Sequence, residues 1–165
     1  MKLKVAAFWL VIFAALFVFL QEYSKYHFYF IEQIQLFQFT WEYISEKLII
    51  PGGFALALSE FLVQFFILPY AGAAITAGLL VIAGLEIRGI VRRIVPDTNM
   101  FLLYLIPVAL IMFIHFDFNY LVFGTVALDI MLLALYLCVR MSNDKWRIGA
   151  EILLTPILFG LIGAA

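Results

Sequence analysis

The sequence predicts an all-α membrane protein: a polytopic bundle of about five transmembrane helices, with amphipathic helices at its outer surface. Hydrophobic residues make up 67% of the 165 residues and charged residues only 13%. A soluble globular domain has about half apolar and about a quarter charged residues. The apolar residues also gather in five long runs, and a run of that length in lipid is expected to be a helix, because its backbone polar groups must bond internally.

The first run, residues 5–21, follows Lys2 and Lys4 and contains no charge before its end. It could be the core of a signal peptide. However, it leads into the polar segment QEYS at residues 21–24 rather than into a small-residue cleavage site. We therefore expect a spanning helix that stays attached.

Four further runs follow, each near the roughly 20 residues that cross a ~30 Å hydrocarbon core, although the second and last of the four are short. The predicted spans are residues 61–85, 100–115, 120–139 and 150–165. Pro69 is expected to break or kink the entry into the first of these. The last run stops inside an apolar stretch, so we expect this single membrane domain, residues 1–165, to be the front part of a longer protein.

The basic residues predict the orientation. They fall before the first span, after the second and after the fourth: Lys2 and Lys4; Arg88, Arg92 and Arg93; Arg140, Lys145 and Arg147. Cytoplasmic loops carry the excess of Lys and Arg. The amino terminus is therefore expected in the cytoplasm, and the acidic loop 22–60 on the opposite side of the membrane, with the chain crossing several times.

The external loop contains the aromatic but partly polar stretch EQIQLFQFTWEY, residues 32–43. On one continuous helix through residues 32–48, the polar and apolar side chains fall on opposite sides. We therefore expect an amphipathic helix lying at the outer interface with its apolar side toward lipid. Pro51 would end it, and residues 54–68 would include a second short interfacial helix before Pro69.

The same loop holds the first candidate site residues. Glu32 and His27 are candidate catalytic groups, because Phe28, Phe30 and Phe39 would partly desolvate the Glu32 carboxylate and so favour general-base chemistry. The candidate substrate-binding residues are Gln33, Gln35, Glu42, His115 and Asp117. The alternative is an interfacial helix whose carboxylates merely face water.

His115 and Asp117 lie in the short external turn IHFDFNY, residues 114–120. They have room to approach His27 and Glu32, where they would form a site for acid–base chemistry and for a divalent ion, if one is used. Alternatively, Asp117 and Asn119 cap the next helix. The lone cysteine, Cys138, and the lack of a Cys–His cluster give no metal-site spacing, and the sequence identifies no cofactor.

Asp129 is the one polar intramembrane residue singled out, about ten residues into its span and roughly 15 Å deep. Buried acids in membranes are usually functional. Three interpretations remain open: a hydrogen bond to Thr76 or Thr125, a place on a proton or ion path, or a pair with a basic residue from further spans of the expected longer protein. Glu86 is expected to pair with Arg88 at the membrane edge. No second acid is predicted beside Asp129, which makes transport the weaker interpretation.

The strings YHFYFIEQIQLFQFTWEY and PGGFALALSEFLVQFF resemble the amino-terminal portion of an uncharacterised family of multi-span inner-membrane proteins of Bacteroidota. The resemblance covers most of residues 1–140. It implies a bacterial inner-membrane location and no known activity, and members of the family are considerably longer.

The layout is also similar to that of membrane glycosyltransferases that use polyprenyl-phosphate sugars. Those enzymes have one span, then a large external loop with an essential acid, then a second span. Glu32 takes the place of that acid, while Gln33 stands where a second acid is expected. The resemblance implies an enzyme acting on a lipid-linked substrate at the outer face. The alternative is a non-enzymatic subunit that docks another membrane protein through the amphipathic helix. A nucleic-acid partner is not expected.

Overall fold

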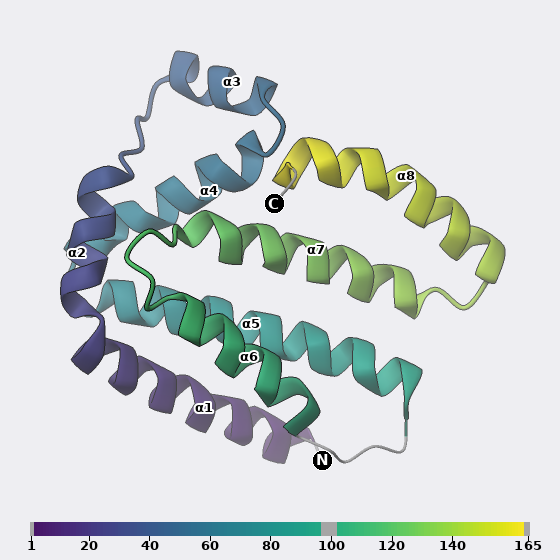
Figure 1. Ribbon diagram of the computed structural model, residues 1–165. Helices are drawn as coiled ribbons and strands as arrows, with labels where there is room; N and C mark the ends of the chain where they lie inside the picture. Colours follow the sequence, from purple (N-terminus) through teal and green to yellow (C-terminus); the bar gives the residue numbers. More distant parts are fainter. Residues whose placement is uncertain (1, 97–101, 164–165) are drawn as a thin grey trace.

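The computed structural model describes residues 2–96 and 102–163, and every regular element in these ranges is helical (Figure 1). The all-α prediction is therefore confirmed. The elements are α1 Lys2–Tyr23, α2 Lys25–Ile34, α3 Trp41–Ile49, α4 Gly53–Val63, the 3-10 helix η1 Gln64–Ile67, α5 Ala71–Ile94, α6 Leu102–Ile114, α7 Val122–Arg140 and α8 Asp144–Ile162.

Three of the described helices are long and apolar enough to cross a membrane: Leu3–Tyr23, Ala71–Ile94 and Val122–Arg140. With 19 to 24 residues each, they measure about 30 Å or more at 1.5 Å per residue. They correspond to the first, second and fourth predicted spans. The apolar helix over Leu103–Ile114 is shorter, and α8 carries charges in its first two turns. A total of five spans stays a prediction.

The predicted second span, residues 61–85, has the wrong limits. As expected, the chain breaks at Pro69, where Tyr70 adopts a left-handed φ of 68°. Proline lacks the N–H that would continue a helix, so α4 and η1 end before it. Helix α5 then runs on to Ile94, well past the predicted end, and this extension brings Glu86 into the bundle.

The prediction of one amphipathic helix through residues 32–48 is also wrong. Helix α2 ends at Ile34, and α3 begins only at Trp41. The Thr40 side chain accepts a hydrogen bond from the Tyr43 N–H and so caps α3. Between the two helices, the Phe37 ring packs on Phe61 of α4 at 5.7 Å between centroids. Capping and tertiary packing therefore outweigh the helical periodicity.

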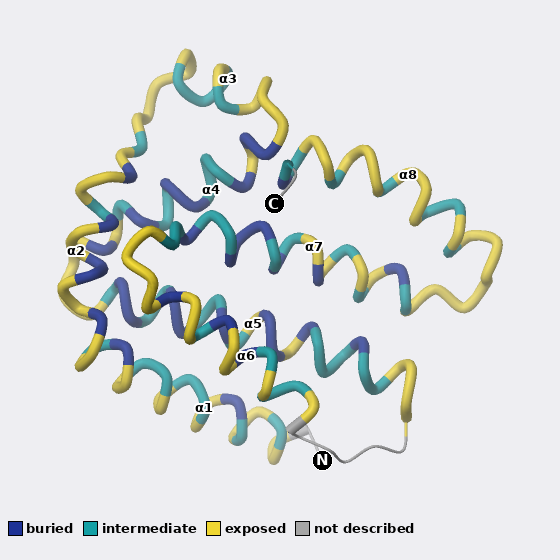
Figure 2. The backbone as a smooth tube through the Cα atoms, in the orientation of Figure 1, coloured by how far each residue is buried: buried dark blue, intermediate teal, exposed yellow. Residues whose placement is uncertain are grey.

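Helix α5 lies at the centre of the bundle, in contact with α1, α6 and α7. Its small buried residues let the neighbouring helices approach closely. At Gly84, a Cβ atom would collide with the Trp9 indole of α1 and would meet Val108 of α6. Figure 2 shows the buried positions concentrated along α4, α5 and α7.

The bundle has two ends. One end, which we call the His27 end, consists of the end of α1, helix α2, the start of α5 and the turn between α6 and α7 (Figure 1). The other, which we call the Arg93 end, consists of the start of α1, the end of α5, the end of α7 and the start of α8. All three basic clusters therefore lie on segments at the Arg93 end, as their alternation along the sequence predicts.

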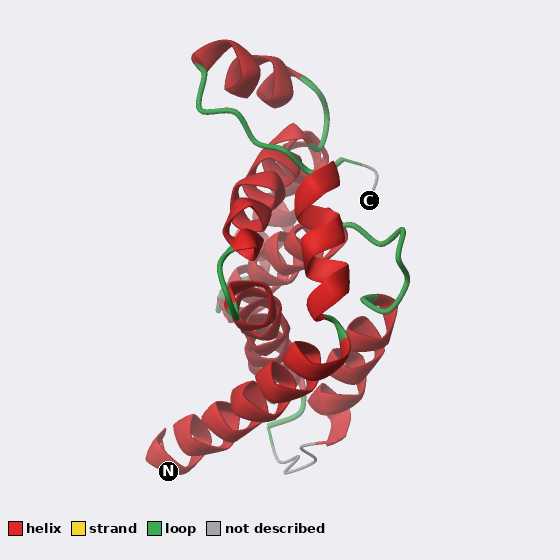
Figure 3. Cartoon of the chain, turned by 90° about the vertical axis from the view of Figure 1, so that its left-hand side faces the viewer, coloured by secondary structure: helices red, strands yellow, loops and turns green. Residues whose placement is uncertain are grey.

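Helices α8 and α4 meet end to end beside α7 (Figure 1). The Gly52 N–H donates a hydrogen bond of 2.9 Å to the Gly160 carbonyl. Gly52 and Gly163 have φ values of +84° and +73°, and a Cβ on Gly52 would lie 3.2 Å from the Gly163 nitrogen. Helix α3 packs on α4 and stands apart from the rest of the bundle (Figure 3).

Candidate functional site

The candidate site lies at the His27 end. After α1, the chain turns at Ser24, and α2 crosses the end of the bundle with His27, Phe28 and Ile31 buried. The Phe28 ring meets Phe66 of η1 at 5.3 Å between centroids. A Cβ at Gly72 would lie 2.7 Å from Phe28, so the glycine lets α2 sit close to α5. This packing holds His27 on the inner side of α2.

His115 follows α6 and is only 2% exposed. Its Nε2 lies 2.8 Å from the Thr125 hydroxyl of α7, which also lies 3.0 Å from the Tyr120 hydroxyl. The hydrogen bonds join the end of α6 to the first turn of α7. Burial, helped by the nearby His27, lowers the pKa of His115 to about 4. The imidazole is therefore neutral at pH 7.

His27 lies next to this group, with its ring edge-on to Phe118 at 5.2 Å between centroids. Burial lowers its pKa, while the backbone of Phe118 and His115 and the charge of Asp117 act in the opposite direction. Its Nε2 has no hydrogen-bond partner among the described residues. His27 is thus a neutral imidazole at pH 7 that can accept a proton.

Asp117 is exposed and shapes the turn instead of capping α7. Its Oδ1 accepts a 2.9 Å hydrogen bond from the Asn119 N–H. The residue that begins α7 as its N-cap is Leu121, and no side chain makes the capping hydrogen bond there. The capping alternative is therefore wrong, because the carboxylate bonds within its own turn and remains close enough to act on His27.

The structure brings together His27, His115 and Asp117, but Glu32 does not join them. Glu32 is partly buried, and it has no hydrogen bond or ion pair in the described ranges. It lies five positions after His27, which places it about 140° around the helix. The predicted aromatic enclosure is wrong, since Phe30 and Phe39 are 46% and 74% exposed and only Phe28 is buried.

The other predicted binding residues are dispersed. Gln33 lies exposed on α2, and Glu42 lies exposed on α3. Gln35 is buried at the end of α2, and its Oε1 has no partner within the described part of the chain. Only Gln35 of the three is therefore held inside the structure.

One polar cluster was missed from the sequence. Lys47 of α3 lies 2.7 Å from one oxygen of the buried Glu60 carboxylate of α4, and the Tyr43 hydroxyl donates to the other. Burial alone would lower the pKa of Lys47, but the bond to Glu60 outweighs it and raises that pKa. These contacts anchor α3 on α4. The sequence signal that could have predicted this ion pair is the opposite charge of Lys47 and Glu60 on two adjacent predicted helices.

The second missed feature lies deeper in the bundle. Glu86 of α5 and Asp129 of α7 are both buried, and their charges act on each other. The expected pair of Glu86 with Arg88 is wrong, because the ion pairs of the described residues join Lys47 with Glu60 and Arg147 with Asp144. The hydrogen bond expected from Asp129 to Thr76 or Thr125 is also wrong: neither Asp129 oxygen is bonded among the described residues. The early predicted end of the second span concealed Glu86.

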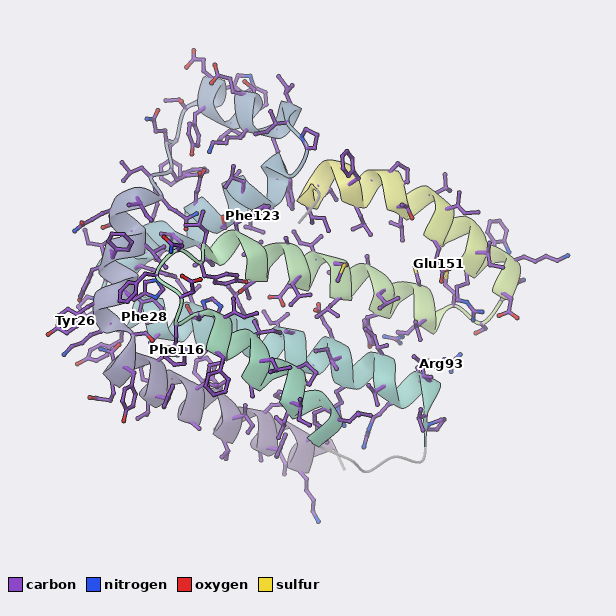
Figure 4. The ribbon with its side chains drawn as sticks, in the orientation of Figure 1. Tyr26, Phe28, Arg93, Phe116, Phe123 and Glu151 are labelled. Atoms are coloured by element: carbon purple, nitrogen blue, oxygen red, sulfur yellow. The ribbon has the colours of Figure 1, made fainter. Side chains whose placement is uncertain are left out.

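Of two cavities in the described structure, one lies beside the site and the other at the opposite end of the bundle. The first is apolar, measures about 340 Å³ and lies between α1 and α6; its lining includes Ile12, Leu16, Phe19, Leu105, Val108 and Met112. The second, about 350 Å³, is at the Arg93 end, and its lining includes Arg93, Ser142, Arg147 and Glu151. Figure 4 shows Arg93 and Glu151 far from Tyr26, Phe28 and Phe116 at the His27 end. No group of three or more His, Cys, Asp or Glu side chains that could hold a metal ion occurs within residues 2–96 and 102–163.

Comparison with known proteins places the chain in a family. A family model described as a family of unknown function matches residues 1–165. The predicted resemblance to an uncharacterised family is confirmed to this extent. No curated protein and no solved structure matches the chain.

Proposed function

The chain belongs to the DUF6057 family, whose function is unknown, and we propose that it is a multi-pass membrane protein that performs acid–base chemistry on a lipid-linked substrate at its His27 end. Three apolar helices of spanning length support the membrane location. Exposed Tyr23, Tyr26 and Tyr70 at the His27 end and Trp146 at the other end resemble the aromatic belts of the two interfaces. The basic clusters favour a cytoplasmic Arg93 end.

The apolar cavity between α1 and α6 is the observation that carries the proposal. Its lining reaches Phe19, near the end of α1. The Phe19 ring lies 5.9 Å from Phe116, the residue after His115. A polyprenyl chain in this cavity would therefore present its phosphate-linked head group at the turn that holds His115 and Asp117, beside His27.

Glycosyl transfer from a polyprenyl-phosphate sugar is the reaction class that this arrangement supports best. His27 Nε2 would take the proton of an acceptor hydroxyl while that oxygen bonds to the anomeric carbon and the polyprenyl phosphate leaves. Asp117 would stabilise the imidazolium that forms. Glu32 lies on the outer side of the same helix and stays a candidate for contact with the acceptor.

The test measures sugar transfer from an undecaprenyl-phosphate-linked sugar by the purified chain in lipid vesicles. General-base catalysis contributes about 100-fold to 10,000-fold, so His27→Gln is expected to lose at least about 100-fold of the rate. Glu151→Gln, an exposed substitution at the Arg93 end, should leave the rate unchanged. Equal rates for wild type, His27→Gln and Glu32→Gln would refute acid–base catalysis at this end.

A second function, the docking of another membrane subunit, is favoured by α3. This helix buries none of its residues, and its Trp41 and Ile49 are 77% and 81% exposed. An amphipathic helix presented in this way suits a hydrophobic groove on a partner. A photoreactive group at position 41 would then capture a protein, whereas capture of lipid alone would speak against docking.

A further inference from the structure

Two buried acids of the bundle, Glu86 and Asp129, are not used by the chemistry proposed at the His27 end. Glu86 and Asp129 are each 8% exposed, on helices α5 and α7, which pack along each other. Their charges act on each other. Among the described residues, both oxygens of Asp129 and Oε2 of Glu86 have no hydrogen-bond partner. Unpartnered polar atoms at such depth call for an explanation.

No described basic residue neutralises the pair. The described ion pairs join Lys47 with Glu60 and Arg147 with Asp144, both elsewhere. Besides the pair itself, Tyr120, in the turn before α7, is influenced by Asp129. Helices α1, α4, α6 and α8 also pack on α5 or α7, but among described residues they supply no charge that acts on either acid.

We propose that Glu86 and Asp129 form a proton-binding pair that holds one exchangeable proton inside the bundle. Two buried carboxylates on packed helices, with the charge of one acting on the other, disfavour the doubly ionised state. One bound proton neutralises one of the two carboxylates, and it bonds to a single carboxyl oxygen. A metal ion would need more ligands than two carboxyl groups provide, and no third candidate ligand is grouped with them in the described ranges.

Polar groups also lie between Asp129 and the His27 end, and among the described residues no hydrogen bond joins Asp129 to them. Thr125 lies one helical turn before Asp129 on α7. Its hydroxyl contacts His115 Nε2 at 2.8 Å and the Tyr120 hydroxyl at 3.0 Å, and a hydroxyl can both donate and accept. His27 lies beyond His115, and the charge of the exposed Asp117 acts on its ring. A proton entering at this end would therefore meet polar groups from the surface to Thr125.

A hydrophobic carbodiimide tests the pair, because it reacts with protonated carboxyl groups in apolar surroundings. The carboxyl proton moves to a carbodiimide nitrogen and the carboxylate oxygen bonds to the central carbon. The adduct then rearranges to a stable acylurea that mass spectrometry locates. With the full chain in lipid nanodiscs and dicyclohexylcarbodiimide, we expect modification of Asp129 or Glu86, decreasing as the pH is raised. A water-soluble carbodiimide should modify the exposed Glu151 instead.

Substitution separates a shared proton from two independent acids. Glu86→Gln removes the neighbouring charge, so the pH of half-modification of Asp129 is expected to fall by about one unit, a tenfold loss of proton affinity. Asp129→Asn should do the same to Glu86, and Glu151→Gln should change neither.

The proposal is overturned if the wild-type chain is modified at neither acid at any pH at which it stays folded. It is also overturned if each acid keeps its pH of half-modification when the other is replaced. The wild-type measurement requires no variant to fold. Because it requires no sugar transfer, it is also independent of the function proposed for the His27 end.

Discussion

At the scale of single residues, His115 makes the stability of the fold depend on pH. The folded protein binds a proton at His115 only near pH 4, whereas the unfolded chain binds one near 6.5. The contribution of His115 to stability is therefore complete above about pH 6.5 and is lost as the pH falls toward 4. The difference corresponds to about 3 kcal/mol in the free energy of unfolding.

We expect the thermal unfolding midpoint of the wild-type chain in detergent to fall between pH 7 and pH 5. His115→Gln removes this titration while its amide can still bond Thr125, so its midpoint should change less over the same range. Glu22→Gln, on the exposed surface of α1, serves as the control and should follow the wild type. Identical pH profiles for wild type and His115→Gln would show that His115 does not titrate in this way.

The sequence could place the turn with His115 and Asp117 near His27, but it could not place Glu32 or Glu86. The turn with His115 and Asp117 is short and lies at a helix end, so its approach to His27 could be inferred from topology. The placement of Glu32 could not, because α2 packs on η1 with Phe28 against Phe66, and this tertiary contact sets which way each face of α2 points. Glu86 was missed because Arg88, two residues later, made it look like a membrane-edge residue.

At the scale of elements, the attachment of α3 depends on one ion pair. Lys47 and Glu60 join α3 to α4 at a partly buried contact, supported by the Tyr43 hydroxyl. Glu60→Gln removes the charge that holds Lys47, and we expect a loss of about 1 to 2 kcal/mol of local stability. Backbone amides of α3 should then exchange hydrogen for deuterium about 5-fold to 30-fold faster, while those of α5 keep their rates.

Glu46→Gln is the matched control, because Glu46 is exposed on the same helix and has no described ion pair or side-chain hydrogen bond. Its exchange rates should equal those of the wild type. If Glu60→Gln and Glu46→Gln give the same rates in α3, the ion pair is not what holds this helix.

The long apolar helices α1, α5 and α7 could be predicted from the sequence because an uninterrupted apolar run has few alternatives. The segment between α1 and α5 could not be predicted in detail. Its periodicity indicates one helix through residues 32–48, but Thr40 caps a new helix and Phe37 packs on Phe61. Such tertiary contacts are not visible in a local pattern.

At the scale of the whole molecule, the two ends of the bundle differ in chemistry. The Arg93 end carries the basic clusters. The His27 end gathers histidines, aromatic side chains and an exposed acid next to an apolar cavity. This polarity supports one orientation in a bilayer, with the His27 end on the outer side. It also places the cavity between α1 and α6 where a lipid tail and its head group could bind together.

The most direct measurement of this account uses a photoreactive polyprenyl phosphate in vesicles that contain the purified chain. After illumination, mass spectrometry locates the attached probe. We predict attachment to α1 and α6 at residues that line the cavity, such as Leu16 and Met112, and competition by unmodified polyprenyl phosphate. Attachment confined to α3 or α8, or attachment that excess polyprenyl phosphate does not reduce, would contradict a lipid-linked substrate at the His27 end.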